Sequence, residues 1–598
     1  MARLALVSAL AALAGLAAAV PVRAQPLELL PGVTYERKTQ FTPHGPVTIH
    51  VVRAPKPTGL YRLRPSLAQD RVLGRETVTS MQRRRASQAT AVGVNGDFFS
   101  LSDGRPSGIT LRDGVLVTPP HPGRSSLGVG VDGALDVRRL SLRATWAGTG
   151  PRRPIANLNK APGPASASLF TGDWGSATPR VADGIAVVLA PFPDAVPNAD
   201  LESVVTAVVE GGAPTPIAPG TAVLVGRGAA AALLREEALV GGTVVVRLVL
   251  RPEWTGVTDA IGGGPVLIRD GTPVAHAGEA LTTSQLVSRN PRSAVGQRAD
   301  GTVLLVTVDG RQPGYSVGMT SFELALAMLR LGAVRAMALD SGGSATLAFD
   351  GTVLSRPSDG RERAVASALM LEYYGVVARP PREPVLSPNG DGVADRQVLA
   401  YKVVVPSEVE VTLTAPDGTT AFTQTTQRPP GTFVVPFPPP AVVPEGLPRA
   451  GTRTFAPVEG RWTLTVSATD EQGLVSTDSR AFSVNSTLGF LQVGPSVLRL
   501  RSSGGAARVR WRQTRSARVR LSVETREGTV VRALALGRLG PGSHEATWNG
   551  RSSRGTPVSP GRYVLRVSAE NELGTVALER AVLVRRAARA SRRRALPY

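Results

Sequence analysis

Two aspartates that each follow an apolar run have the placement most suggestive of chemistry in this 598-residue chain. Asp309 comes directly after the β-branched run Thr302–Val308, and Asp340 comes directly after the shorter run Ala336–Leu339. Both runs have the composition of buried strands that end at a turn. An aspartate at such a position can serve catalysis, or it can simply cap the turn, because turns favour aspartate.

The segment between the two runs has the pattern of a single helix. Thr320 and Glu323 have the spacing of a capping box, and Gly332 provides a stop. Apolar side chains recur at helical spacing at Phe322, Leu326 and Leu329. A strand–helix–strand order predicts neighbouring parallel strands, whose carboxyl ends meet at one edge of a sheet. We therefore expect Asp309 and Asp340 at the same edge.

Three further segments extend the pattern toward the N-terminus. They are AVGVNGDFF at Ala91–Phe99, DAIGGGPVLIRDG at Asp259–Gly271 and NPRSAVG at Asn290–Gly296. Together with the strand that ends in Asp-Gly-Arg and the final Leu-Asp-Ser-Gly-Gly-Ser turn, these five motifs, in this order, resemble the phosphodiester glycosidase family. The resemblance covers about Thr77–Tyr374. The sequence departs from the family's usual glycine in two places, at Asp97 and at Ser341.

The resemblance implies hydrolysis of a sugar-1-phosphate diester at the anomeric carbon, through an oxocarbenium-like transition state. It assigns catalysis to Asp309 and Asp340 as base, nucleophile or charge stabiliser, with Asp97 as an added carboxylate. Arginines suit the phosphate because guanidinium groups are planar and permanently charged, and glycines let backbone amides approach a ligand. The residues expected to bind substrate are Asn95, Arg292, Arg311, Gly263, Gly264, Gly342, Gly343, Ser344 and Arg363.

No cofactor is required by this chemistry, but clustered carboxylates can attract a divalent cation such as calcium. One candidate cluster is Asp97, Asp309 and Asp340, and a second is the glycine-containing loop with Asn389, Asp391 and Asp395. The second loop lacks the full twelve-residue calcium pattern that ends in glutamate, so a plain turn is the alternative. A different overall interpretation is a non-catalytic polysaccharide-binding or envelope-organising protein on the same fold.

Composition indicates an exported protein. A basic residue and an apolar run precede an Ala-x-Ala-like cleavage site at Val22–Ala24, so residues 1–24 have the pattern of a signal peptide, with a retained anchor as the alternative. The chain has no cysteine, which excludes disulfides and thiolate chemistry. These features predict a periplasmic, envelope or extracellular location, with no transmembrane helix after cleavage.

The formal net charge of +22 is large, and most of the cations are arginines. No nucleic-acid-binding motif accompanies the charge, so nucleic acid is not an expected partner. The expected partners are the sugar-phosphate or polysaccharide substrate and an anionic envelope polymer, held by the C-terminal domains and the basic tail.

The fold class expected is α+β, with a β-rich catalytic domain of mixed sheet and few helices, followed by two all-β Ig-like sandwiches. Thr547–Ala569 resembles the Ig-like domain of flagellar hook-capping proteins, and Gly460–Gly473 repeats the pattern of Gly561–Gly574. The predicted division is a signal peptide (1–24), an N-terminal β-rich extension (25–80), a phosphodiester glycosidase-like domain (81–378), a linker (379–386), Ig-like domains at 387–486 and 487–585, and a basic tail (586–598).

Overall fold

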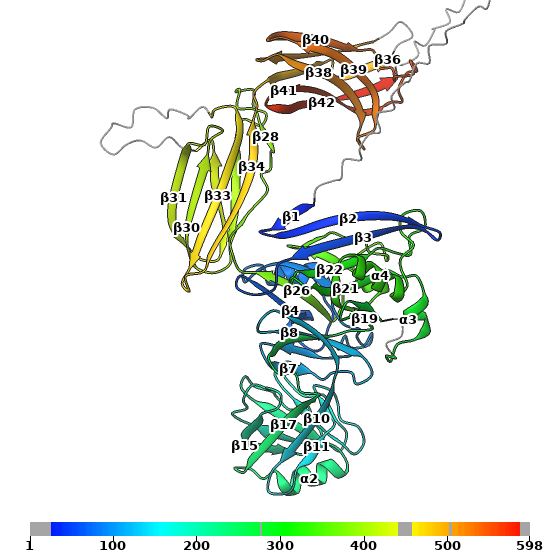
Figure 1. Ribbon diagram of the computed structural model, residues 1–598, viewed down its shortest axis with the longest axis vertical. Helices are drawn as coiled ribbons and strands as arrows, with labels where there is room; N and C mark the ends of the chain where they lie inside the picture. Colours follow the sequence, from blue (N-terminus) through cyan, green and yellow to red (C-terminus); the bar gives the residue numbers. More distant parts are fainter. Residues whose placement is uncertain (1–25, 275–277, 440–456, 501–504, 587–598) are drawn as a thin grey trace, which may run out of the picture.

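The computed structural model describes residues 26–274, 278–439, 457–500 and 505–586. The predicted signal peptide and the tail beyond Arg586 lie outside these residues. Figure 1 shows a β-rich N-terminal part followed by two sandwiches. Strands greatly outnumber helices, which confirms the predicted fold class. Among the described residues, no helix has the length and apolar character needed to span a membrane.

The first sheet of the N-terminal part has the strand order β1-β2-β3-β22-β21-β23-β19-β20. Its strands are β1 (Leu27–Leu30), β2 (Val33–Thr42), β3 (Gly45–Ala54), β19 (Val266–Arg269), β20 (Thr272–Pro273), β21 (Arg292–Arg298), β22 (Val303–Val308) and β23 (Ala333–Ala338). Since β3 pairs with β22 over six residues, the segment predicted as a separate extension at 25–80 is part of this domain. The prediction of an extension was therefore wrong.

The strands that precede the two aspartates are not neighbours. β21 lies between β22 and β23 and is antiparallel to both. The two outer strands therefore run in the same direction, and their carboxyl ends do meet at one edge, as expected. Between them, α4 (Ser321–Arg330) has the predicted capping box of Thr320 and Glu323. On α4, Leu324 and Met328 are buried, whereas Phe322 and Leu329 are exposed.

Two five-stranded sheets complete the core that surrounds the first sheet. One has the order β25-β24-β5-β26-β4 and the other β7-β6-β18-β8-β9. Leu305, Leu371 and Leu127, one from each of the three sheets, belong to a single apolar core. The strands are β4 (Tyr61–Leu67), β5 (Thr90–Asn95), β24 (Leu347–Phe349), β25 (Thr352–Val353), β26 (Ser367–Tyr373), β6 (Thr110–Arg112), β7 (Val115–Thr118), β8 (Ser125–Gly130), β9 (Leu135–Arg139) and β18 (Val257–Gly262).

The middle of the chain builds an additional eight-stranded sheet with its own core, drawn at the lower end of Figure 1. Its strands are β10 (Ser141–Ala147), β11 (Arg153–Ile155), β12 (Asn157–Leu158), β13 (Ala167–Phe170), β14 (Ile185–Leu189), β15 (Asp200–Val209), β16 (Ala222–Gly226) and β17 (Thr243–Arg251). The remaining helices of the N-terminal part are η1 (Ala68–Asp70), α1 (Val78–Arg84), α2 (Ala229–Glu237), α3 (Thr283–Val287) and η2 (Gly342–Ser344).

The first sandwich begins before the predicted linker. It pairs a sheet of order β27-β29-β32 with one of order β28-β34-β33-β30-β31. Because β27 and β28 flank the proline-rich stretch and both belong to this sandwich, residues 379–386 are not an interdomain linker. The strands are β27 (Val377–Ala378), β28 (Val385–Leu386), β29 (Gln397–Val403), β30 (Ser407–Thr414), β31 (Thr420–Arg428), β32 (Gly431–Phe437), β33 (Gly460–Asp470) and β34 (Val475–Val484).

The second sandwich repeats this arrangement with the orders β35-β37-β40 and β36-β42-β41-β38-β39. Strands β33 and β41, which carry the two halves of the sequence repeat, have the same length and the same alternation of buried and exposed residues. The strands are β35 (Leu488–Gly494), β36 (Val497–Leu500), β37 (Ala507–Gln513), β38 (Ala517–Thr525), β39 (Val530–Leu539), β40 (Gly542–Trp548), β41 (Gly561–Asn571) and β42 (Gly574–Arg586).

Candidate active site

Turns from several strands meet at the edge where β5, β18, β22 and β23 end. The Asp340 amide donates to the Gly96 carbonyl (3.0 Å), and the Gly342 amide donates to the Pro291 carbonyl (2.9 Å). A Cβ built on Gly263 would lie 2.6 Å from the Ala338 carbonyl oxygen. Glycine is therefore required where these turns touch, and the five sequence motifs converge on one place.

Asp340 provides a carboxylate at this edge. The residue is partly exposed, and its Oδ1 accepts a hydrogen bond from the Ser341 amide (2.8 Å). Burial of the carboxylate among the turns raises its pKa to about 6, against the opposing effects of Ser344, Arg363 and Arg124. A carboxyl group with a pKa close to neutrality can exchange a proton at physiological pH, as general acid–base chemistry requires.

Asp97 is a second carboxylate beside Asp340, but it is buried. Its Oδ2 accepts from the Gly108 amide (2.6 Å), its Oδ1 accepts from the Phe98 amide (2.8 Å), and a Cβ on Gly262 would lie 2.5 Å from Oδ2. Burial raises the pKa of Asp97 to about 6, and the Asp340 charge contributes to that rise. The two carboxyl groups are thus electrostatically coupled, and each makes ionisation of the other more difficult.

Arg124, which the sequence did not single out, balances this pair of acids. Its Nη1 lies 3.7 Å from Asp97 Oδ1, and its guanidinium group lies 4.8 Å from the centre of the Phe98 ring. It also lowers the pKa of Asp340. The residue is buried, directly before β8. Nothing in the sequence distinguishes it from the many other arginines except its position ahead of an apolar strand.

Two predicted arginines lie directly over the turn that follows Asp340. A Cβ on Gly342 would lie 3.0 Å from Arg311 Nη2, and one on Gly343 would lie 2.1 Å from Arg363 Nη2. Arg311 is exposed, with its Nε bonded to Asn290 Oδ1 (2.9 Å). Arg363 pairs with Asp359 (2.7 Å). Their guanidinium groups provide positive charge next to Asp340, and Arg363 lowers the pKa of its carboxyl group.

Ser344, the last residue of the same turn, is buried, and its hydroxyl helps to lower the pKa of Asp340. Its Oγ makes no hydrogen bond of ordinary geometry within the described structure. Gly264, a predicted substrate-binding residue, belongs to the triple-glycine turn and lies against Glu279. The Oε1 atom of Glu279 accepts a hydrogen bond from the Val266 amide (2.7 Å). Glu279 thereby fixes the triple-glycine turn next to the site.

Asn95 does not have a side chain available for substrate. It is fully buried, and its Nδ2 donates to the backbone oxygen of Asp340 (2.8 Å). Its Oδ1 accepts from Ser293 Oγ (2.6 Å) and from the Thr346 amide (3.1 Å). These bonds join β5, β21 and the turn after β23. The geometry therefore indicates that Asn95 positions Asp340, and the expected contact with sugar hydroxyls has no support in the structure.

Asp309 is likewise engaged inside the protein. Its Oδ2 lies 2.8 Å from His50 Nε2 and accepts from the Tyr315 hydroxyl (2.9 Å), while its Oδ1 accepts from the Arg356 amide (2.9 Å). The carboxylate is buried. Arg311 follows two residues later and has a φ of 58°, which is a strained backbone conformation for arginine. The bonds of Asp309 hold the start of the loop that carries it. Asp309 is placed to position that loop, away from a direct catalytic role.

Arg292 is also occupied, contrary to the expected phosphate contact. Its guanidinium group donates to three backbone carbonyls, those of Met319 (2.8 Å), Gln285 (2.6 Å) and Ser288 (2.7 Å). Burial lowers its pKa to about 10. The residue joins the end of α3 to the segment before α4, so it holds together one wall of the site.

The carboxylates of the two predicted metal clusters stay candidates, and the structure shows how the second cluster is bonded. Among the described residues, no group of three or more His, Cys, Asp or Glu side chains is placed to hold an ion. In the loop before β29, Asp395 accepts from the amides of Asn389 and Gly392 (2.9 and 2.8 Å), and Asp391 accepts from the Phe490 amide (2.6 Å). These carboxylates are bonded to backbone amides, and they join the two sandwiches.

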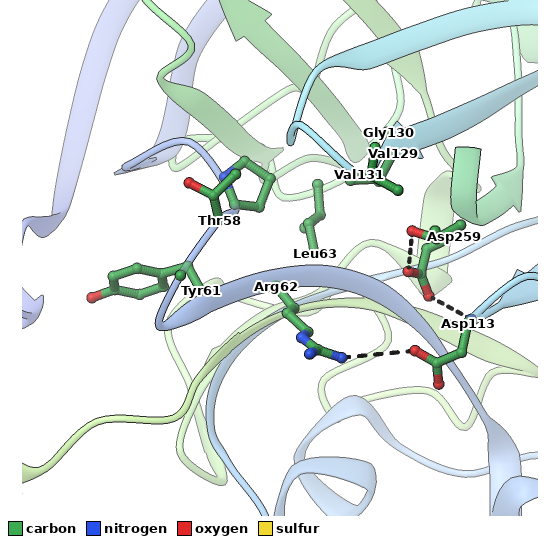
Figure 2. A pocket seen from close by; sticks show the side chains of 12 residues that line it. Thr58, Tyr61, Arg62, Leu63, Asp113, Val129, Gly130, Val131 and Asp259 are labelled. Atoms are coloured by element: carbon green, nitrogen blue, oxygen red, sulfur yellow. Dashed lines mark hydrogen bonds and ion pairs between the residues drawn. The ribbon is translucent and has the colours of Figure 1, made fainter. Parts of the chain in front are cut away.

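A hollow of about 420 Å³ lies at the opposite ends of β8 and β18, away from Asp340. Figure 2 shows Arg62 directed toward Asp113, at a distance of 3.9 Å. Asp259, at the back of the hollow, is paired with Arg64 (3.7 Å). The charged groups of the hollow are paired as ions, and the hollow lacks the glycine turns of the candidate site.

Comparisons with known proteins match two regions of the chain. Residues 201–372 match the family profile described as phosphodiester glycosidase, and residues 498–572 match the profile of the FlgD Ig-like domain. The first match contains Asp340 but not Asn95 or Asp97, which the structure places beside it.

The chain is 36% identical over 118 residues to the SPbeta prophage-derived uncharacterized protein YomE of Bacillus subtilis. It is 33% identical over 112 residues to N-acetylglucosamine-1-phosphodiester alpha-N-acetylglucosaminidase of Bos taurus. These alignments span 20% and 18% of this chain, but only 18% and 20% of the two relatives.

Among solved structures, a hypothetical protein from Synechocystis is similar at 24% identity and a TM-score of 0.48, over 57% of this chain and 62% of that one. By the family profiles, residues 201–372 of this chain are similar to phosphodiester glycosidase domains, and residues 498–572 are similar to the Ig-like domain of FlgD.

Proposed function

We propose that this protein is an exported hydrolase that cleaves a sugar-1-phosphate diester, with a sugar similar to N-acetylglucosamine, in envelope or extracellular polysaccharide. The observation that carries the proposal is the turn after β23. There, the carboxylate of the partly exposed residue Asp340 interacts electrostatically with Asp97, and the guanidinium groups of Arg311 and Arg363 lie over Gly342 and Gly343. The family match and the similarity to the bovine enzyme support the same reaction class.

The reaction breaks the bond between the anomeric carbon and the phosphate oxygen, and the electron pair leaves with the phosphate. A phosphomonoester is a good leaving group, so strong protonation of the departing oxygen is not needed. Arg311 and Arg363 are placed to bind the phosphate and to stabilise the charge that develops on it. Their ordinary partners, Asn290 and Asp359, keep both side chains at the turn in the absence of substrate.

Asp340 acts on the anomeric carbon in this scheme. As a carboxylate it stabilises the positive charge of the sugar ring, and it either bonds the carbon or removes a proton from the attacking water. Asp97 and Arg124 set the charge state of Asp340, while Asn95 fixes the backbone from which it projects. Asn95, Asp309 and Arg292 are positioning residues.

The proposed export depends on the N-terminal sequence, since residues 1–24 have a signal-peptide pattern and the chain has no cysteine. The two sandwiches that follow the catalytic part suit a spacer at the cell surface. An active-site test uses a panel of sugar-1-phosphodiesters with detection of released reducing sugar. Wild type should turn over at least one member, and Asp340→Ala should not.

A second candidate function follows from Asn95, Arg292 and Asp309, whose side chains are all hydrogen-bonded within the protein and leave fewer groups for catalysis. On this alternative the fold is a non-catalytic platform that binds polysaccharide. It predicts that wild type binds members of the panel without releasing any reducing sugar, and that Arg311→Met weakens this binding. Arg269→Met, an exposed arginine on β19, is the matched control.

A further inference from the structure

The second sandwich holds a disproportionate share of the positive charge. Residues 487–586 contain 18 arginines and no lysine against six glutamates, a difference of +12 within a chain whose formal net charge is +22. The charge is not spread evenly over this domain. At the end that faces the first sandwich, Arg515 is neutralised by Glu459 (2.5 Å) and approaches Glu572 (3.7 Å). On the faces, Arg566 pairs with Glu579 (2.6 Å) and Arg510 with Glu545 (2.6 Å).

The opposite end of the sandwich gathers arginines from strand ends and loops. Arg499 and Arg585 are directly paired in register between β36 and β42. Thr525 pairs with Tyr563, so Arg526 and Arg562 are the adjacent residues at the ends of β38 and β41. The loop that contains Arg554 reaches the same end, because a Cβ on Gly550 would lie 2.3 Å from Leu500 Cδ2. We call this surface the distal arginine end; its six exposed members are Arg499, Arg526, Arg554, Arg562, Arg585 and Arg586.

These six guanidinium groups lack the carboxylate partners found elsewhere on the domain. Within the described part of the chain none of them is in a salt bridge, and the carboxylate in their neighbourhood is Glu527, next to Arg526. Like charges held together repel each other, and the repulsion is relieved by an anion. The arginines are exposed and spread over the ends of several strands, so the matching ligand is an extended polyanion that contacts many of them in turn.

The chemistry of this end favours a phosphate polymer over other polyanions. Guanidinium groups bind phosphate in a bidentate manner, and here no lysine substitutes for them. Single-stranded nucleic acid would require exposed aromatic rings for base stacking, and a membrane surface would require an apolar edge. Among the described residues near this end, Val530 is the exposed large apolar side chain.

We propose that the distal arginine end binds a linear, phosphodiester-linked envelope glycopolymer and thereby holds the enzyme on its substrate. This inference rests on the proposed function for its choice of polymer. Figure 1 shows the end of β42 pointing away from the first sandwich, so a bound polymer meets no obstruction from that domain. The binding surface is on the folded domain, and the arginines that follow Arg586 in the sequence add charge without being required.

The test measures binding of the full chain to immobilised poly(glycerol phosphate), which has the phosphate backbone but no sugar-1-phosphate bond to cleave. The variant is the triple substitution Arg526→Gln, Arg562→Gln and Arg585→Gln. The matched control removes three exposed, unbridged arginines of the N-terminal part, Arg143→Gln, Arg251→Gln and Arg269→Gln, and so changes the net charge equally. A third protein ends at Arg586.

Wild type, the control and the shortened protein should bind, and binding should weaken as salt rises. The distal variant should bind at least about tenfold more weakly, with the slope of log K against log salt reduced by about 2, because three phosphate contacts are lost. Equal binding by the distal variant and the control would overturn the inference, as would loss of binding only in the shortened protein. Tighter binding to duplex DNA or to phosphatidylserine vesicles would overturn the choice of partner.

Turnover of a small soluble sugar-1-phosphodiester separates this inference from the proposed function. The distal variant should turn over that substrate at the wild-type rate, because its substitutions lie outside the candidate active site. Normal turnover with unchanged polymer binding would overturn the inference alone. Arginine-dependent polymer binding in a protein that hydrolyses no member of the panel would overturn the proposed function alone.

Discussion

Replacing Arg292 by methionine distinguishes a positioning role from a phosphate-binding role for this buried arginine. Its three hydrogen bonds to carbonyl oxygens are charge-assisted, and each is worth about 1.5–3 kcal/mol, or roughly 5–9 kcal/mol in total. Burial lowers the pKa of Arg292 from 12.5 to about 10, which corresponds to roughly 3 kcal/mol of desolvation cost already present in the folded protein. The expected net loss of stability is therefore about 2–6 kcal/mol.

The loss should be local, because the three carbonyls belong to α3 and to the segment before α4. Hydrogen exchange followed by mass spectrometry should show faster exchange in residues 283–291, while the sandwiches exchange as in wild type. Arg289→Met is the control, since its pair with Glu323 is partly exposed and should contribute less than about 1 kcal/mol. A raised KM for the phosphodiester with unchanged exchange in Arg292→Met would refute the reasoning and restore a phosphate contact.

Three other perturbations follow from the geometry. Burial raises the pKa of Asp340 from 3.8 to about 6, so between these pH values the folded protein holds a proton that the unfolded chain has lost. The free energy of unfolding, measured by urea titration, should therefore fall as the pH rises from about 4 to about 6. The turnover rate should rise toward pH 7 in a pH–rate profile, because Asp340 becomes a carboxylate. Gly343→Ala should displace Arg363 and raise KM at least about tenfold without loss of stability, whereas Gly172→Ala, where the added Cβ meets no atom within 4 Å, should do neither. Asp350→Ala should destabilise the junction with the first sandwich by about 3–5 kcal/mol in urea unfolding, because the buried Lys402 ammonium loses its carboxylate and keeps a bond to the Ala89 carbonyl oxygen. Wild-type stability would exclude a structural ion pair there.

The sequence was sufficient to place the carboxyl ends of β22 and β23 at one edge, because strand composition and the capping box of α4 are local signals. It could not show that β21 lies between the two strands, since strand order depends on contacts distant in sequence. Helical spacing alone likewise did not show which side of α4 packs against the sheet. Phe322 and Leu329 are exposed, and the apolar residues of α4 that are buried are Leu324, Ala325, Ala327 and Met328.

The same limit applies to the site residues. Residue type indicated that Arg292 and Asn95 could bind a ligand, but whether a polar side chain is free depends on its partners in the fold. Arg292 donates hydrogen bonds to three backbone carbonyls, and Asn95 makes three hydrogen bonds to neighbouring strands and turns. Conversely, Arg124 lies outside every quoted motif and approaches Asp97 only through the pairing of β8 with β18. Its function could not be inferred from local sequence.

The duplication of the sandwiches could be inferred because it leaves a local record. Gly460–Gly473 and Gly561–Gly574 share an aromatic residue, an alternating strand and an acidic turn, and β33 and β41 adopt the same burial pattern. The boundary before the first sandwich was misplaced because its edge strands are very short. β27 and β28 have two residues each, too few to give a period-two signal on either side of the prolines.

The measurement that tests the central claim most directly is the hydrolysis of an N-acetylglucosamine-1-phosphate diester by wild type and by Asp340→Asn. Asparagine keeps the size of the side chain and can still accept from the Ser341 amide, so the turn should be preserved. We predict that wild type releases reducing sugar and that kcat of the variant falls by about a thousandfold or more, with unchanged thermal stability at pH 5. Turnover by Asp340→Asn within about tenfold of wild type would contradict the assignment of Asp340 as the catalytic carboxylate.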